Sequence, residues 1–302
     1  MNKSNNETRC GFIAVLGLPN AGKSTLINLM VGEKVSIVSR KAQTTRMQIR
    51  GIVLEGNSQI VLIDTPGIFQ GKRTLDRSMV EAAWAGLDDS DICVLIVDVS
   101  QKNCIEDQKP LLERINQTGK PKWLVLNKID RVKKDKLLEI TAALNEQASF
   151  EQTFMIAALS GYGVPDLQKA LGEAVKKGPW VYGEDQITDI SQRLLAAEVT
   201  REHIYDQLHD ELPYSIAVET EQWEDFQNGD LKLTQIIFVQ RDSQKAIILG
   251  KGGAQIRKLG ERARHDIGEL FERKVHLSLL VKVKENWMDD PERYAFMGLQ
   301  KR

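Results

Sequence analysis

The amino-acid sequence predicts an α/β fold, in which a doubly wound, mostly parallel sheet is followed by a second, smaller α+β domain. Short apolar runs alternate with helical patterns over the first 180 residues, as is typical of parallel strands covered by helices. The glycine-rich stretch GLPNAGKST (17–25) joins the first apolar run to the first helical pattern. After residue 190 the order becomes α-β-β-α-α-β, which indicates a separate domain.

The first domain is expected to contain five parallel strands and one antiparallel strand. Its apolar runs lack the polar alternation of a half-exposed strand, so we expect both faces to be covered. The segment 47–56 precedes the second run after a short turn and is expected to pair with it in antiparallel fashion. The predicted parallel strands are 12–18, 58–64, 91–99, 122–127 and 153–159, and the predicted helices lie near 23–31, 75–88, 104–118, 134–149 and 164–176.

A segment with several glycines and no clear period, KKGPWVYGEDQITD (176–189), separates the two halves. We place the first domain at 1–177, a linker at 178–190 and the second domain at 191–302. Within the second domain, LKLTQIIFVQ (231–240) alternates as expected for a sheet with one covered face. The other predicted elements are a helix at 190–210, a strand at 214–221, helices near 243–249 and 254–272, and a strand at 274–284.

Composition restricts the class of protein less than the motifs do. The chain has 302 residues, 42% of them hydrophobic, and its net charge of −1 indicates no particular partner. The three cysteines lack CxxC spacing, which argues against a disulfide framework or a zinc site and favours a reducing cytosol. Cys93, inside the apolar run DICVLIVDV, is expected to be a core residue.

No stretch approaches the roughly 20 apolar residues that a membrane span needs. The polar start, MNKSNNETRC, lacks the apolar segment of a signal peptide. We therefore expect a soluble, cytoplasmic protein, and attachment to a membrane surface is left open.

The stretch GLPNAGKS matches G-x-x-x-x-G-K-[ST], between a predicted strand and a predicted helix as this phosphate-binding motif requires. Its glycines let backbone N–H groups turn toward phosphate oxygens, and the helix N-terminus adds partial positive charge. Lys23 is expected to reach the β- and γ-phosphates, and the Ser24 hydroxyl is expected to ligate Mg²⁺.

Two later segments are expected beside the triphosphate. DTPG (64–67) ends a predicted strand, so Asp64 can hold the Mg²⁺ shell while Gly67 offers its N–H to the γ-phosphate and acts as a hinge. AQTTR (42–46) supplies two adjacent threonines, either of which can complete the Mg²⁺ shell, and we favour Thr45. The γ-phosphate is then expected to order the loops near 33–46 and 67–77.

The tetrapeptide NKID (127–130) also ends a predicted strand. Asp130 is placed to accept hydrogen bonds from N1–H and the exocyclic amine of guanine, whereas adenine would leave the carboxylate unpaired. Asn127 and Lys128 are expected to brace the base and the phosphate loop, and the backbone of AAL (157–159) to reach guanine O6. An ATPase is disfavoured on this ground.

These residues predict hydrolysis of GTP by attack of water on the γ-phosphate, through positioning and charge neutralisation without a covalent intermediate. The residue after DTPG is Ile68, which can neither orient nor polarise water. We therefore expect slow intrinsic hydrolysis, helped by another group or a partner, in a protein that works as a timed switch.

The segment GKGG (250–253) lies between two predicted helices and matches the G-x-x-G loop of KH domains. Over 241–285, Lys and Arg number 11 and Asp and Glu number 6, a basic excess suited to single-stranded RNA. Some basic side chains of the following helix, among them Arg262 and Arg264, are expected to pair with Glu261 or Asp266 at (i, i+4) spacing. For Trp287, core packing is preferred to stacking on a base.

With these motifs the chain resembles the Era-like subfamily of translation-factor-class GTPases, which carry a C-terminal type II KH domain. The resemblance runs from GLPNAGKST through QTTR, DTPG, NKID, EDQITD and GKGG to VKENW. It implies binding to the 3′ end of small-subunit ribosomal RNA, a role in maturation of that subunit, a monomeric state, and a cytoplasmic location with some association with the inner membrane face. It also implies a GTPase fold for the first domain and a KH fold for the second.

The chain departs from this subfamily at two places. Ala157-Ala158 stands where Ser-Ala is usual, so a serine hydroxyl contact to the base is lost while a backbone contact survives. Gly183 stands where the linker usually has proline, which predicts a looser orientation of the domains. Neither change removes the phosphate or guanine chemistry.

The candidate site residues fall into four groups. Those for catalysis are Lys23, Thr45 and Gly67, and those for Mg²⁺ are Ser24, Thr45 and Asp64. Those for GTP are Gly17, Asn20, Ala21, Gly22, Lys23, Ser24, Thr25, Thr45, Asp64, Thr65, Pro66, Gly67, Asn127, Lys128, Asp130, Ala157, Ala158 and Leu159. Those for RNA are Gly250, Lys251, Gly252, Gly253, Arg257 and Lys258.

Two other functions fit parts of the sequence. One is a GTP-binding signalling module whose second domain contacts protein instead of RNA, which RNA-dependent stimulation of hydrolysis would distinguish. The other is a different ribosome-assembly or tRNA-modifying GTPase, against which the KH signature argues.

Overall fold

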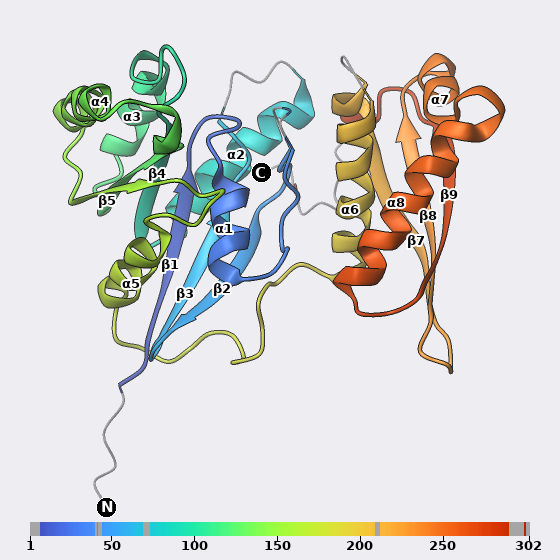
Figure 1. Ribbon diagram of the computed structural model, residues 1–302, viewed down its shortest axis with the longest axis horizontal. Coiled ribbons are helices and arrows are strands. Elements are labelled where there is room, and N and C mark those ends of the chain that lie inside the picture. Colours follow the sequence, from blue (N-terminus) through green and yellow to red (C-terminus); the bar gives the residue numbers. More distant parts are fainter. Residues whose placement is uncertain are drawn as a thin grey trace, which may run out of the picture. The chain divides into compact units, whose positions relative to one another are not determined.

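The computed structural model describes residues 7–39, 41, 44–68, 73–208, 212–289 and 299, and these fall into two compact units (Figure 1). The first unit takes the described residues within Met1–Ser36, Thr45–Gly71 and Met79–Asp189. The second takes those within Ile37–Thr44, Lys72–Ser78 and Ile190–Arg302. Two short segments of the predicted first domain, 37–44 and 72–78, therefore group with the second unit.

The first unit is built on a six-stranded sheet with the order β2-β3-β1-β4-β5-β6. β2 runs antiparallel to β3, as expected for the segment 47–56, and the other neighbouring pairs are parallel. The strands are β1 (Arg9–Leu16), β2 (Ile49–Glu55), β3 (Ser58–Asp64), β4 (Ile92–Asp98), β5 (Lys122–Asn127) and β6 (Gln152–Ile156).

Helices cover both faces of this sheet because its central strands are apolar on both sides. Side chains of α1 and α5 share a core with one face, and side chains of α2, α3 and α4 share a core with the other. Cys93 is fully buried in the second core, as predicted. The helices are α1 (Lys23–Val31), α2 (Thr74–Asp88), α3 (Lys109–Asn116), α4 (Lys134–Gln147) and α5 (Val164–Ala174).

For three predicted elements of this unit, the difference from the prediction has a local physical reason. The first strand stops at Leu16 because the glycine-rich turn begins at the next residue. The helix expected at 104–118 is a short 3₁₀ turn at 106–108 followed by α3, whose first turn holds a proline. The last strand stops at Ile156 because the N–H of Ala157 turns to bond the carbonyl of Tyr162.

The second unit has a three-stranded sheet with the order β7-β8-β9, in which β7–β8 is antiparallel and β8–β9 parallel. Alternate residues of β8 pack against the helices, so the sheet has one covered face, as its sequence pattern predicted. The elements are α6 (Gln192–Gln207), β7 (Ala217–Asp225), β8 (Leu231–Val239), α7 (Asp242–Leu249), α8 (Ala254–Leu270) and β9 (Val275–Val283). This order is the predicted α-β-β-α-α-β.

The largest departure in this unit is at the predicted strand 214–221. A 3₁₀ turn occupies Pro213–Ser215, so β7 starts at Ala217 and continues to Asp225. Trp287 is buried and its indole N–H donates to the carbonyl oxygen of Ser215 at 3.2 Å, which confirms its expected place in the core. Among the helices that the structure describes, none is long and apolar enough to cross a membrane.

Candidate functional site

The predicted nucleotide residues meet at one edge of the first sheet. β1, β3, β4 and β5 are parallel, so their carboxyl ends lie along the same edge. The glycine-rich loop follows β1, and Asp64, Asp98 and Asn127 end the next three of these strands. β1 lies between β3 and β4, where the chain order of the sheet reverses, which is where open α/β sheets bind their ligands.

Lys23 places a cation inside the glycine-rich loop. The side chain is buried, and its ammonium group donates to the carbonyl oxygens of Gly17 at 3.0 Å and Leu18 at 3.1 Å. Burial lowers the pKa of Lys23 to about 8, although the charge of Asp64 opposes this shift. A phosphate oxygen is the kind of partner that would stabilise this buried cation.

Three hydroxyl groups converge on one carboxylate oxygen. Asp64 Oδ2 accepts from Ser24 Oγ at 2.7 Å, from Ser36 Oγ at 2.7 Å and from Thr45 Oγ1 at 3.3 Å. Ser24 Oγ and Thr45 Oγ1 lie 2.8 Å apart. The other candidate, Thr44, instead donates its hydroxyl to the carbonyl oxygen of Lys41 at 2.9 Å, so the geometry favours Thr45.

This cluster fits a divalent cation. Burial raises the pKa of Asp64, and the hydrogen bonds from Ser36 and Ser24 only partly oppose that. Its second oxygen, Oδ1, is buried and has no hydrogen-bond partner within the described part of the chain. Hard oxygen ligands of this kind suit Mg²⁺, which Ser24, Thr45 and Asp64 would hold, directly or through water. When bound, Mg²⁺ supplies charge neutralisation at the β- and γ-phosphates.

Two glycines allow the backbone to approach this site closely. Gly22 has φ of 101°, and a Cβ there would lie 2.3 Å from Asn127 Nδ2. At Gly67 a Cβ would lie 3.0 Å from the N and Cα atoms of Pro19 in the phosphate loop. A side chain at either position would therefore push apart the segments that form the site.

The NKID residues brace the loop from β5. Asn127 Nδ2 donates to the carbonyl oxygen of Ala21 at 2.8 Å. Lys128 Nζ donates to the carbonyl oxygen of Asn20 at 2.8 Å and to Asp98 Oδ2 at 2.6 Å. The ammonium group of Lys128 is thus fixed between the phosphate loop and the end of β4.

The predicted base-binding groups are open to solvent or already engaged. The Asp130 side chain is 60% exposed, which leaves its carboxylate accessible to an incoming base. The N–H of Ala157 donates to Tyr162 O and the N–H of Ala158 donates to Asn127 Oδ1, each at 3.0 Å. The backbone contact to guanine O6 stays a prediction. Because the N–H groups of Ala157 and Ala158 have acceptors within the protein, we expect the N–H of Leu159, a residue that is 87% exposed, to make this contact.

Some of the predicted nucleotide-binding residues make contacts within the fold and do not face the Asp64 cluster. Two residues that do contact the site residues were not predicted from the sequence. Thr65 is buried and donates its hydroxyl to the carbonyl oxygen of Val15 at 2.8 Å. Pro66 is buried, and Thr25 is half-buried in the first turn of α1. Sequence reasoning missed Ser36, which carries no motif, and Asp98, whose place at the end of β4 beside Asn127 was a usable signal.

Ile68 follows the DTPG segment without offering a polar side chain. It is half-buried and packs with the core that α2, α3 and α4 share. Its N–H donates to the carbonyl oxygen of Gly17 at 3.4 Å. Parts of the loops expected to respond to the γ-phosphate, at residues 40, 42, 43 and 69–72, lie outside the described residues.

In the second unit, GKGG forms a turn between α7 and α8. Gly250, Gly252 and Gly253 have φ of 69°, 61° and 76°, conformations that favour glycine. A Cβ at Gly250 would lie 2.6 Å from Gln255 Cβ, whereas at Gly253 it would meet nothing within 4 Å. Lys251 is exposed on this turn, so its charge is available to a polyanion.

The basic residues of α8 lie on its solvent face. Leu259, Ala263 and Ile267 bury the opposite stripe at (i, i+4) spacing. The exposed basic side chains are Arg257, Lys258, Arg262 and Arg264. Asp266, expected to pair with one of these, instead contacts His203 Nε2 at 2.9 Å and His265 Nδ1 at 3.3 Å.

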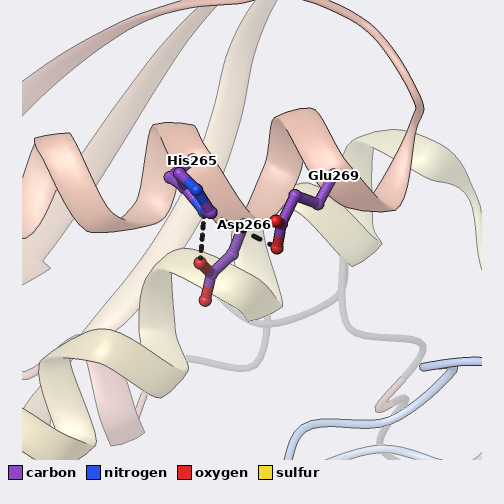
Figure 2. Close-up of side chains that lie close together, drawn as sticks. All are labelled: His265, Asp266 and Glu269. Atoms are coloured by element: carbon purple, nitrogen blue, oxygen red, sulfur yellow. Dashed lines mark hydrogen bonds and ion pairs between the residues drawn. The ribbon is translucent and has the colours of Figure 1, made fainter.

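Farther along α8, His265, Asp266 and Glu269 form a small polar cluster (Figure 2). His265 Nδ1 lies 3.6 Å from Glu269 Oε2, and the His265 and Glu269 side chains are 67% and 72% exposed. Because both oxygens of Asp266 already contact histidines, these polar groups have partners within the protein and do not need a metal.

Family models match both units. A family described as a 50S ribosome-binding GTPase matches residues 12–128, and the KH domain family matches residues 211–288. The two matches cover the phosphate loop through Lys128 and the GKGG turn with its flanking helices.

Curated relatives match nearly the whole chain. The GTPase Era of Afipia carboxidovorans is 54% identical over 293 residues, covering 97% of this chain and 95% of the relative. The GTPase Era of Brucella suis biovar 1 is 54% identical over 293 residues, covering 97% of this chain and 94% of the relative.

Solved structures match over the same length. Era in complex with MgGDPNP and nucleotides 1506–1542 of 16S ribosomal RNA has a TM-score of 0.91 at 34% identity, covering 97% of this chain and 100% of that one. A point variant of Aquifex aeolicus Era bound to GDP·AlF₄⁻ has a TM-score of 0.90 at 33% identity, with the same coverage.

Proposed function

Since the chain belongs to the Era family of GTPases, we propose that it hydrolyses GTP and uses its KH unit to bind the 3′ end of 16S ribosomal RNA during assembly of the small ribosomal subunit. The observation that most directly supports GTP binding and hydrolysis is the convergence of Ser24, Thr45 and Asp64 beside the buried Lys23. A preformed set of one cation, two hydroxyls and one carboxylate suits a triphosphate with Mg²⁺.

In this proposal each residue has one task. Lys23 neutralises charge on the β- and γ-phosphates, and Ser24, Thr45 and Asp64 hold the cation. Asp130 pairs with the guanine edge, while Asn127 and Lys128 keep the base-binding turn fixed to the phosphate loop. Gly67 offers its N–H to the γ-phosphate, and its lack of a side chain lets it lie close to Pro19.

Hydrolysis by these residues proceeds by attack of water on the γ-phosphate. The protein contributes alignment and charge, and none of its side chains forms a covalent intermediate. Ile68 cannot orient the water, since it packs with its aliphatic side chain in the core. Slow intrinsic turnover follows, which suits a switch that a partner accelerates.

The RNA half of the proposal depends on the GKGG turn. Its glycines leave room for a nucleic-acid backbone, and Lys251, Arg257 and Lys258 are exposed beside it. The relative crystallised with nucleotides 1506–1542 of 16S ribosomal RNA supports this RNA as the ligand. Phosphate contacts by these basic residues predict a strong dependence of affinity on salt.

We also propose that the chain acts as a monomer in the cytoplasm and associates peripherally with the inner face of the membrane. This part follows the resemblance to the subfamily, and no described helix could span a bilayer. Sedimentation of the purified chain and fractionation of cells would test the oligomeric state and the location.

The decisive experiment compares GTP hydrolysis with and without an RNA oligonucleotide that has the 3′-terminal sequence of 16S ribosomal RNA. We expect this RNA to raise the rate, and a scrambled oligonucleotide of equal length to leave it unchanged. Equal stimulation by both oligonucleotides would contradict recognition of the 3′-terminal sequence. No stimulation by either would contradict RNA binding and favour a signalling module whose second unit contacts protein.

A further inference from the structure

Ser36 is a buried hydroxyl residue of the first unit, beside the Asp64 carboxylate. The residue is 1% exposed, and its Oγ donates to Asp64 Oδ2 at 2.7 Å, the same distance as for Ser24 Oγ. Hydrogen bonds to an ionised carboxylate are stronger than those to a neutral acceptor. A serine outside every recognised motif therefore contacts the carboxylate as closely as the serine of the phosphate loop does.

One side chain of α1, that of Asn28, holds the backbone at Ser36. Asn28 Oδ1 accepts from the N–H groups of Val35 and Ser36, each at 3.0 Å. Asn28 Nδ2 donates to the carbonyl oxygen of Ser36 at 2.7 Å. The side chain of Val35 is fully buried in the core that α1 and α5 share with the sheet. The chain at Ser36 is thus fixed to α1 by three hydrogen bonds and by the packing of the preceding residue.

The same helix also carries Ser24. Asn28 follows Ser24 by four residues in α1, so both residues lie on the same face of the helix. Ser24 reaches Asp64 directly, whereas Asn28 reaches it through Ser36. All four residues belong to the first unit. α1 is therefore connected to the carboxylate by two separate routes.

These contacts limit how the Asp64 carboxylate can turn. Oδ2 accepts from three hydroxyl groups, and rotating it away would leave buried donors unpaired, which is costly. Oδ1 is buried and has no hydrogen-bond partner within the described ranges of the chain, so it stays the oxygen available to a cation or to water that the cation binds. Ser24 and Thr45 would also have to direct an oxygen lone pair at the cation, a demand that Ser36 does not share in the proposed site.

We infer that Ser36, held by Asn28, is a positioning residue that fixes the Asp64 carboxylate for Mg²⁺ in the GDP-bound and the GTP-bound state alike. The inference rests on the nucleotide site proposed above. Thr45 is assigned to the γ-phosphate as well as to the cation, so its contribution changes when that phosphate leaves. Ser36 acts on Asp64 and not on the γ-phosphate, so its contribution is the same with either nucleotide.

The test measures how free Mg²⁺ slows the release of fluorescent GDP, and of a fluorescent non-hydrolysable GTP analogue, from the full chain. In Ser36→Ala we expect half-maximal slowing to need about tenfold more Mg²⁺ with either nucleotide, because a hydrogen bond to an ionised carboxylate is lost. In excess EDTA, the variant and the wild type should release each nucleotide at rates within about twofold. General damage to the site would instead speed release with and without Mg²⁺.

Ser58→Ala is the matched control for this change. Ser58 is 5% exposed, and its hydroxyl also donates at 2.7 Å, but to the neutral carbonyl oxygen of Gly172. Ser58 is the first residue of β3 and Asp64 the last, so the control lies at the opposite end of the same strand. This variant should lower the melting temperature and leave the Mg²⁺ dependence of nucleotide release unchanged.

A second variant tests the role of Asn28. Asn28→Ala frees the backbone at Ser36 and should raise the Mg²⁺ requirement in the same direction, but by less than Ser36→Ala does. In the double variant the requirement should be no higher than in Ser36→Ala alone, since Asn28 acts through the Ser36 hydroxyl. An effect of Asn28→Ala that adds in full to that of Ser36→Ala would overturn the role given to Asn28.

An unchanged Mg²⁺ requirement in folded Ser36→Ala overturns the positioning role. So does release that accelerates equally with and without Mg²⁺. If circular dichroism shows that Ser36→Ala is unfolded, Asn28→Ala decides the question by the same two criteria. A wild-type chain that binds neither nucleotide, or that releases both at rates independent of Mg²⁺, would instead refute the nucleotide site itself.

Discussion

The nucleotide site and the GKGG turn use glycine and lysine for opposite purposes. In the first unit, Lys23 is buried, and Asn127 lies so close to Gly22 that a Cβ there would overlap it. The site is therefore a preformed set of polar groups. In the second unit, Lys251 is exposed, and a Cβ at Gly253 would meet no neighbour.

This difference predicts two kinds of recognition. A buried, braced site discriminates strongly because a wrong ligand leaves desolvated groups unpaired. An exposed turn gains its contacts only when the RNA arrives, and its affinity comes largely from phosphate charge and therefore falls with salt. Substitutions should accordingly have larger and more ligand-specific effects at the first site than at the second.

The largest effect is expected from Asp130→Asn. An amide cannot accept from both N1–H and the exocyclic amine of guanine, but it can pair with the additional carbonyl of xanthine. We expect the affinity for GTP to fall about a thousandfold and the preference to move to xanthosine triphosphate. Competition binding with both nucleotides measures this, and retained GTP preference would contradict the assigned role of Asp130.

The next largest effect is expected from Gly22→Ala. The new methyl group would overlap Asn127 Nδ2, and the backbone conformation, with φ of 101°, is unfavourable for alanine. We expect the affinities for GDP and GTP to fall together by about a hundredfold, since both nucleotides use this loop.

Gly32→Ala is the matched control for that change, because it has φ of 83° and no neighbour within 4 Å of the added Cβ. It lies at the end of α1, so it should lower the melting temperature while leaving nucleotide affinity nearly unchanged. Equal losses of affinity in the two variants would mean that the effect comes from backbone strain alone, and not from contact with Asn127.

A smaller effect, confined to RNA, is expected from Gly253→Asp. The side chain fits, but it brings negative charge to the place where a phosphate backbone would pass. We expect RNA affinity to fall by about tenfold to thirtyfold in filter binding, and GTP affinity to stay unchanged.

Gly229→Asp introduces the same charge at φ of 87°, also with no neighbour within 4 Å, but in the turn between β7 and β8. It is therefore a close control for strain and charge. RNA binding that fails equally in both variants would show that GKGG has no special role.

The smallest effect is expected from Asp98→Asn, which weakens the anchor of Lys128. Burial alone would raise the pKa of Asp98, but hydrogen bonds from Lys128, Ser100 and Gln101 outweigh it, so the pKa lies below its ordinary value. We expect GDP and GTP affinities to fall severalfold together, because the side chain supports the loop that both nucleotides use.

The lowered pKa also sets a pH dependence. A carboxylate with a lowered folded pKa stabilises the fold fully above its unfolded pKa of about 4, and this contribution is lost as the pH falls through the folded value. The stability difference between the wild type and Asp98→Asn should therefore be constant from pH 7 to 5 and shrink below about 4. Urea unfolding at several pH values measures it, and a difference that changes between pH 7 and 5 would contradict the lowered pKa.

The sequence predicted those parts of the molecule that depend on local pattern. Five apolar runs located the parallel strands of the first sheet to within a few residues, and the short turn after the segment 47–56 located its antiparallel strand. Four short motifs identified the turns at the carboxyl edge. The preference for Thr45 over Thr44 agrees with the geometry, in which the two hydroxyl groups point to different partners.

What the sequence could not predict are contacts between residues far apart in the chain. Ser36 donates to Asp64 and Arg201 holds the carbonyl of Thr44, yet neither residue lies in a recognisable motif. The N–H groups of Ala157 and Ala158 are used within the protein, which depends on where Tyr162 and Asn127 lie after folding. Such details follow from tertiary packing, which a pattern of residue types does not contain.

Titration calorimetry of the full chain in the presence of Mg²⁺ tests the central claim most directly, with GTP, GDP and ATP injected in separate runs. A preformed triphosphate site with a guanine-selective carboxylate predicts saturable heat for GTP and GDP and no saturable heat for ATP at the same concentrations. Binding of ATP as tight as that of GTP, or no heat from either guanine nucleotide, would contradict the account.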